Sequence, residues 1–440
     1  MIDAFVNIFR IRELRRGLLI TLGILAIYRL GMVIPVPGLD MGLIHTYLEK
    51  MRQAPLGQVL NLVNLLSGAS WLRLSVFSLG IMPYISATII FQLLLTVSPT
   101  LERLHKEGES GRRKIRQYER LATVAICFLQ GSMVVSLFLK NMPEHPRSMG
   151  FFLGAVLTMT AGGVFLMWLG DQITAFGVGN GISLIIMAGI VGRLPQVGGD
   201  VFTRWKAGNL EEITIGLLGA GFVAAVFAII MVTQGQRRIP MQQAKHVRGR
   251  RVYGGQRQYL PISVNAPGVI PIIFASSLLI MLAQLLRALG GLWEPIGNLG
   301  AGLSFSGQFP AVMAYTALIF FFCFFWTKVQ FRPEEIADNL KEYGSFVPGY
   351  RPGRRTAEFL EQAIERITLV GATFLAIVAV TPQLLSRFVG LGEAAGWFGG
   401  TGILIVVGVS LDLIQRMEMQ LVTRHYRGFL GAAGRVRGRR

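Results

Sequence analysis

Ten apolar runs close to 20 residues long constrain the fold of this chain more than any other feature of its sequence. About 20 apolar residues are what an α-helix needs to cross about 30 Å of hydrocarbon. The runs lie near residues 17–37, 75–98, 118–139, 150–170, 180–198, 212–234, 267–289, 310–328, 367–388 and 398–416. Only 15% of the 440 residues are charged and the mean hydropathy is +0.52, which is too apolar for a soluble protein of this size. We therefore expect an all-α polytopic membrane protein with about ten transmembrane helices.

The positive charges predict how these helices are oriented. Most of the 43 Lys and Arg residues lie in the N-terminal segment, in the connections 99–120, 235–266 and 328–366, and in the C-terminal tail. The positive-inside rule places these segments, and therefore both termini, in the cytoplasm. The first apolar run is not followed by a small-residue cleavage site, so we expect a retained span and not a signal peptide.

Ten spans divide into two halves of five. We expect an N-terminal half over 1–198, a connection over 199–211 and a C-terminal half over 212–440. An odd number of spans in each half means that the halves insert with opposite orientation, which makes them an inverted repeat if they are alike. GIMPYISATII at 80–90 and GVIPIIFASSL at 268–278 open the second span of each half in a similar way.

The second span follows an unusual segment. Within residues 56–98, a short stretch rich in Asn, Ser and Gly precedes a hydrophobic run that begins at a Gly-Ile-Met-Pro sequence. Backbone that leaves the helical hydrogen-bond pattern inside a bilayer needs partners from protein or from water. The sequence therefore predicts an interrupted helix that lines a cavity.

The residues required for enzyme chemistry are missing from the predicted spans. No Lys follows a Gly, which excludes a P-loop, and H-E-x-x-H does not occur. Two cysteines lie within spans, where we interpret them as small packing residues, and all five histidines lie in connections or the tail. These residues are Cys127, Cys323, His45, His105, His145, His246 and His425. We expect no enzyme activity, no cofactor and no metal site.

A secondary transporter and a scaffold or insertase without a pore are two functions open to a membrane protein of this kind. A secondary transporter usually carries Asp, Glu or His deep in the membrane, and these spans are nearly free of them. Asp412 and Arg416, at the inner end of the tenth span, are interpreted as an i,i+4 pair at the interface. A scaffold or insertase without a pore would explain the long connections, but not the segment before the second span.

Two cytoplasmic connections are too long to be simple turns. Residues 235–266 carry seven cations and no acid, which suits a docking surface for an acidic partner or for RNA. Residues 328–366 balance seven cations with seven acids. Their Pro-Gly-Tyr-Arg-Pro-Gly sequence predicts a tight turn that presents Arg351, Arg354 and Arg355.

Isoleucines recur one helical turn apart in two spans. Ile81 and Ile85 lie in the second span, and Ile186 and Ile190 in the fifth. Such pairs usually face lipid or pack in the protein interior, and the spacing alone leaves these interpretations open.

Several stretches, in the same order along the chain, resemble signature sequences of the SecY family. They are GIMPYISATIIFQLL, GNGISLIIMAGIV, GRRVYGGQ with VIPIIFASS, PGYRPGRRTA and FGGTGILIVVGVSLD. The chain departs from commoner family residues at His246, Ser263 and Pro267, which affects details of partner docking. The resemblance implies two five-helix inverted halves around a central pore, with a lateral gate between spans two and three and spans seven and eight. It also implies a channel that translocates unfolded secretory polypeptides across a bacterial cytoplasmic (inner) membrane and releases membrane-protein segments laterally into it.

The resemblance also implies roles for individual residues. The pore ring would consist of Ile81, Ile85, Ile186, Ile190, Ile273 and Ile405. A plug would extend from Asn61 to Trp71 and include Asn61, Leu62, Asn64, Leu65, Leu66, Ser67 and Gly68, although a re-entrant packing helix is an alternative. The lateral gate would carry Ser86, Thr88, Gln92, Ser276 and Ser277, which we expect to form weak interhelical hydrogen bonds.

The family resemblance further implies partners. These are SecE and SecG, the ATPase SecA, the ribosome through its RNA, and the signal sequences of exported proteins in the lipid bilayer. Arg250, Arg251 and Arg351 match basic docking residues of the family's cytoplasmic loops, and Arg354 and Arg355 lie beside them.

Overall fold

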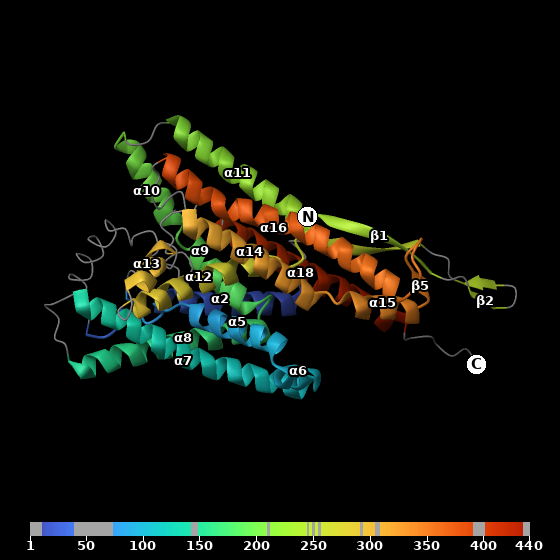
Figure 1. Ribbon diagram of the computed structural model, residues 1–440, viewed down its shortest axis with the longest axis horizontal. Coiled ribbons are helices and arrows are strands. Elements are labelled where there is room, and N and C mark those ends of the chain that lie inside the picture. The colour runs from blue at the N-terminus through green and yellow to red at the C-terminus, as the bar shows by residue number, and fades with distance from the viewer. Residues whose placement is uncertain are drawn as a thin grey trace. The chain divides into compact units, whose positions relative to one another are not determined.

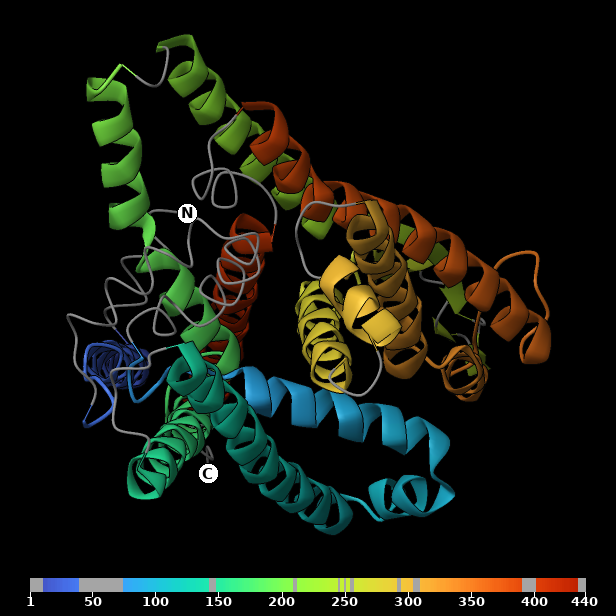
Figure 2. The same cartoon turned by 60° about the vertical axis from the view of Figure 1, so that its left-hand side comes forward.

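Long helices dominate the parts of the chain that the structure, a computed structural model, describes (Figure 1, Figure 2). The described residues are 11–38, 74–141, 148–208, 212–243, 246–248, 251–253, 257–290, 294–303, 309–389 and 401–433. The chain packs as two compact units, Met1–Gly199 with Val409–Arg440, and Asp200–Gly408. The unit boundaries fall within helices α10 and α18, and Val409–Arg440, from the predicted C-terminal half, packs in the first unit.

Each predicted span contains at least one helix. The helices are α2 (Arg12–Gly31), α5 (Met82–Val97), α6 (Pro99–Lys106), α7 (Glu109–Asn141), α8 (Met149–Phe176), α9 (Gly181–Val191), α10 (Leu194–Lys206), α11 (Glu212–Gln234), α12 (Ile270–Leu289), α13 (Glu294–Gly302), α14 (Phe309–Gln330), α15 (Pro333–Glu342), α16 (Arg354–Val389) and α18 (Thr401–Ala433). Within the described ranges, six helical segments are long and apolar enough to cross a membrane, or seven if the bent pair α5 and α6 is one span.

Two spans begin or break where the apolar pattern alone does not predict it. The second helix starts at Met82, several residues after the apolar run begins, and it bends by 98° into α6 at Ser98. Ser98 is extended, with φ −97° and ψ 113°, because the following Pro99 disfavours the helical conformation for the residue before it. The fifth span is divided after Val191 into α9 and α10.

Helix α8 lies at the centre of the packing in the first unit. It contacts α7, α9 and α2, and α7 also packs against α5. Gly162 of α8 lies against the backbone of the interrupted segment, where a Cβ would overlap the Val76 carbonyl. A Cβ on Gly31 of α2 would likewise overlap the Phe77 ring. Small residues therefore let two helices approach the non-helical segment closely.

The second unit combines helices with a small sheet. Helix α14 packs against α12 and α16, and α15 also packs on α16. The Thr368 hydroxyl donates to the Thr327 hydroxyl at 3.3 Å between α16 and α14. Strands β1 (Gln236–Gln243), β4 (Arg257–Ser263) and β5 (Ser345–Phe346) form an antiparallel sheet in the order β4-β1-β5, and β2 (His246–Arg248) pairs with β3 (Arg251–Tyr253). All five described strands lie in the two long connections 235–266 and 328–366, for which the sequence analysis predicted no strands.

The packing at Gly162 predicts a position-specific loss of stability. Gly162→Ala should destabilise the protein by about 1–3 kcal/mol, because the added methyl group forces the Val76 backbone out of its place. Gly154→Ala is the matched control, since a Cβ at this position on the same helix meets no atom within 4 Å. The check is the thermal unfolding midpoint of the purified protein in detergent. Equal midpoints for the two variants would contradict the prediction.

Candidate functional site

The segment that leads into α5 satisfies its backbone groups through protein partners. The Val36 N–H donates to the Leu74 carbonyl and the Val76 N–H to the Ile34 carbonyl, both at 2.9 Å. Within the segment, the Gly80 N–H donates to the Phe77 carbonyl at 2.8 Å. The predicted interruption of the helix is therefore confirmed, with hydrogen bonds from the chain itself. The cavity that we expect it to line stays a prediction.

Ile81 and Ile85 lie at the beginning of α5. Gly80 turns the chain with φ +59°, a conformation that glycine adopts without a steric penalty. The Ile85 N–H then donates to the Ile81 carbonyl at 3.1 Å, which places the two side chains one turn apart. They are 3% and 5% exposed, whereas Ile90 on the same helix is 36% exposed. Their burial argues against the interpretation that this pair faces lipid.

Helix α9 carries the second isoleucine pair and begins at a strong cap. The Asn180 side-chain oxygen accepts hydrogen bonds from the N–H groups of Ile182 and Ser183, at 3.1 and 3.4 Å. This arrangement satisfies donors that lack a partner within the helix. Ile186 and Ile190 are both buried in the three-turn helix that follows.

The first span holds both ends of α9. Near the beginning, the Val178 N–H donates to the Thr21 hydroxyl at 3.2 Å, and this hydroxyl donates to the Gly17 carbonyl. At the other end, the Arg29 guanidinium donates to the carbonyl of Gly192, which caps α9. Hydrogen bonds from α2 therefore hold the segment that leads into α9 and the residue that ends it.

The remaining two predicted ring residues lie in the second unit. Ile273 is on α12 and Ile405 is in the first turns of α18, and both are buried. All six isoleucines are thus buried, four in the first unit and two in the second. Their assembly into one ring stays a prediction.

The predicted gate hydroxyls bond within their own helices. The Thr88 hydroxyl donates to the Tyr84 carbonyl at 3.0 Å, and the hydroxyls of Ser276 and Ser277 donate to the Ile273 carbonyl at 2.9 and 2.7 Å. Ser86 is buried, and the buried Gln92 side-chain oxygen has no hydrogen-bond partner among the described residues. The interhelical hydrogen bonds that we expect at the gate stay a prediction.

Two further expectations have different outcomes. The predicted i,i+4 pair is confirmed, since the Arg416 guanidinium donates to the Asp412 carboxylate at 2.8 Å. The predicted plug, Asn61–Trp71, lies outside the described residues.

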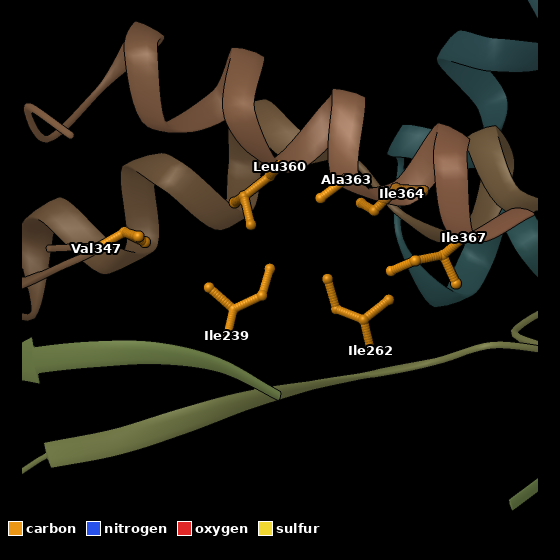
Figure 3. Packing of buried hydrophobic residues seen from close by; sticks show 7 residues of the cluster. All are labelled: Ile239, Ile262, Val347, Leu360, Ala363, Ile364 and Ile367. Carbon is orange, nitrogen blue, oxygen red and sulfur yellow. The ribbon is translucent and has the colours of Figure 1, made fainter. Parts of the chain in front are cut away.

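The two long connections, 235–266 and 328–366, fold together through strand pairing. Strand β1 of the first connection pairs with β5 of the second, Gln242 lying opposite Phe346. Ile239 of β1 and Ile262 of β4 point from the sheet toward α16, as Figure 3 shows. The cluster consists of Ile239, Ile262, Val347, Leu360, Ala363, Ile364 and Ile367. We call the sheet and this part of α16 the platform.

The predicted tight turn presents its arginines beside the platform. The Tyr350 N–H donates to the Val347 carbonyl at 3.1 Å, which closes the turn, and the Tyr350 ring stacks on Phe359 at 4.3 Å. Arg351, Arg354 and Arg355 are exposed there, as predicted. Arg250 lies outside the described residues, and Arg251 belongs to strand β3.

The sheet is the part of the site that the sequence interpretation missed. Its signal was present, because Ile239 and Met241 occupy every second position in β1, and Leu260 and Ile262 do so in β4, with Pro240 and Pro261 between them. An apolar residue at every second position is typical of a strand with one buried face. Proline is disfavoured inside a central strand, so Pro240 and Pro261 weaken this signal.

Comparison with known proteins identifies relatives along the whole chain. The SecY family model matches residues 75–414. The chain is 43% identical to the protein translocase subunit SecY of Thermus thermophilus, over all of both chains. It is 41% identical to the protein of the same name from Escherichia coli K12, covering 96% of this chain and 95% of that protein.

Solved structures share the fold. A structure described as that of a protein conducting channel superposes with a TM-score of 0.64 at 18% sequence identity, covering 93% of each chain. Sec61 in a canine ribosome-channel complex superposes with a TM-score of 0.58 at 16% identity, also covering 93% of each chain. At these identities the likeness supports the fold alone.

The platform's packing generates a prediction. Ile262→Ala should lower the free energy of local unfolding of the platform by about 2–5 kcal/mol. The reason is that the Ile262 side chain is 3% exposed and its removal leaves a cavity between the sheet and α16. Tyr259→Ala on the same strand is the control, since Tyr259 is 57% exposed. Amide hydrogen exchange of β1 and β4 should accelerate in the first variant and not in the second. Unchanged exchange in Ile262→Ala would contradict the proposed packing.

Proposed function

The chain belongs to the SecY family, and we propose that it acts as the channel subunit of a protein translocase. Unfolded secretory polypeptides would cross the membrane through it, and membrane-protein segments would leave it sideways into the lipid. Similarity to translocase subunits over the whole chain carries this proposal. The membrane is the bacterial cytoplasmic membrane, with both termini in the cytoplasm by the charge distribution.

The six isoleucines form the constriction in this proposal. A ring of branched aliphatic side chains yields around a passing chain and resists wetting when closed. Such a ring binds no polypeptide sequence specifically, because it offers no hydrogen-bonding groups. Burial of all six side chains supports this role. Asn61–Trp71 would rest on the ring as the plug.

Lateral release requires a weak contact between gate helices. The gate residues are small or polar, and interhelical hydrogen bonds in membranes contribute on the order of 1 kcal/mol each. An apolar signal sequence that binds the open state better would shift the population toward it. The halves 1–198 and 212–440, joined by 199–211, would open as two inverted repeats.

The energy for transport comes from partners, since the sequence has no P-loop. We propose that SecA and the ribosome bind the platform and the arginines near it on the cytoplasmic side, and that SecE and SecG complete the membrane complex. Arg250, Arg251, Arg351, Arg354 and Arg355 supply cations for carboxylate or phosphate groups.

Site-specific crosslinking tests the constriction. A photoreactive residue at Ile85 or Ile190 should crosslink to a precursor that is stalled midway by a folded C-terminal domain. The matched controls are Ile90 on α5 and Val191 on α9, which are 36% and 40% exposed. Crosslinks from the controls alone, or from the platform alone, would contradict a pore lined by the isoleucines.

Charge reversal tests the docking turn. Arg351→Glu should lower SecA-driven export more than about tenfold, since a loss of about 1.4 kcal/mol of docking free energy already has that effect. Membrane insertion should stay intact. Lys341→Glu, the same charge change at an exposed position of α15, is the control. Wild-type rates of ATP-dependent precursor transport in Arg351→Glu would refute this role.

A further inference from the structure

Arg29, a cation within the first predicted span, forms a hydrogen bond to a distant backbone carbonyl, and the proposed function gives this contact no role. Arg29 lies in the last turn of α2, and its guanidinium donates to the carbonyl of Gly192, 163 residues away. Its second terminal nitrogen donates to the Met32 sulfur at 3.6 Å. An ionised side chain within a membrane span is costly unless it pairs with other groups, and backbone carbonyls are common partners.

The Gly192 carbonyl lies where the fifth span breaks. In an unbroken helix, the Gln196 N–H would donate to this carbonyl. Here it donates to the Arg193 carbonyl at 3.0 Å, as does the Val197 N–H at 3.1 Å. The guanidinium therefore takes the place of the donor that the helix break removes. It also adds positive charge at the C-terminal end of α9, where the helix dipole is negative.

The contact depends on the absence of a side chain at position 192. A Cβ there would overlap the Arg29 guanidinium. By contrast, a Cβ on Gly23 of α2, the helix that carries Arg29, would meet no atom within 4 Å. Gly192 and Gly23 thus form a matched pair for experiment.

The break lies directly beside a ring residue. The Gly192 N–H donates to the Ala188 carbonyl at 3.0 Å, and the Arg193 N–H donates to the Ile190 carbonyl at 3.1 Å. Ile190 is therefore part of the last turn of α9, which the Arg29 contact closes, and its side chain is fully buried. Because α9 has only 11 residues, a change at this end affects a large part of the helix.

We propose that Arg29 is a positioning residue of the channel, which caps α9 through the Gly192 carbonyl and thereby holds Ile190 at the constriction. The inference rests on the proposed constriction. Without the cap, the last turn of α9 loosens, and the isoleucine ring seals less well in the resting state. Arg29 itself does not contact the translocating chain.

The test measures ion leak through the resting channel. The full chain, purified with the subunits that copurify with it, is reconstituted into lipid vesicles containing a halide-sensitive dye, without precursor. Arg29→Gln and Gly192→Ala should each raise the halide leak several-fold, and Gly23→Ala should not. Arg29→Lys keeps one donor and the charge, so its leak should lie between those of Arg29→Gln and the unmodified chain.

The double variant tests whether both substitutions act through one contact. Arg29→Gln with Gly192→Ala should leak no more than the leakier single variant, because each single change already breaks the same hydrogen bond. Additive leaks would overturn the proposal. A lower thermal unfolding midpoint with an unchanged leak would also overturn it, since that result indicates a structural role only.

Crosslinking from Ile190 separates this inference from the proposed channel. If the unmodified chain crosslinks to a stalled precursor but neither single variant leaks, the channel stands and the role of Arg29 is refuted. If Ile190 does not crosslink in the unmodified chain, the constriction itself is wrong, and the inference is overturned with it.

Discussion

The need to satisfy every backbone hydrogen bond inside a membrane governs this structure. A continuous helix meets that need by itself, but this chain leaves the helical conformation before α5 and again between α9 and α10. At each place another segment supplies the partner. Residues 34–36 bond to the segment that precedes α5, and Arg29 bonds to the carbonyl at the end of α9. The first span and its extension thus support both interruptions.

The two interruptions lie beside the helices that carry isoleucine pairs, which links the backbone architecture to the proposed constriction. Ile81 and Ile85 follow the first interruption, and Ile186 and Ile190 precede the second. A short helix held at its ends positions an apolar side chain more accurately than a loop does, because its rotation and length are fixed. An apolar constriction needs that accuracy, since it excludes ions by close fit and by resisting wetting.

The platform is likewise connected to predicted membrane helices by direct packing. Its sheet packs on the first turns of α16, and the same helix continues through Ile367 into a predicted span. The close contact between Gly371 and the Val264 carbonyl extends this packing to the segment that leads into α12. A partner bound to the platform would therefore act on two membrane helices of the second unit through packed side chains rather than through a flexible loop.

By itself, the sequence determined the features that depend on local composition and spacing. These are the ten apolar runs, the interruption before the second helix and the start of that helix at the Gly-Ile-Met-Pro sequence, the tight turn at 348–353 and the Asp412–Arg416 pair. Each arises from residues within one or two turns of each other, so a local pattern carries the information. The tertiary structure decided the strand pairing between the two long connections and the partner of Arg29. These features join segments that lie far apart in the sequence, and no local pattern records which distant carbonyl, strand or glycine will be within reach.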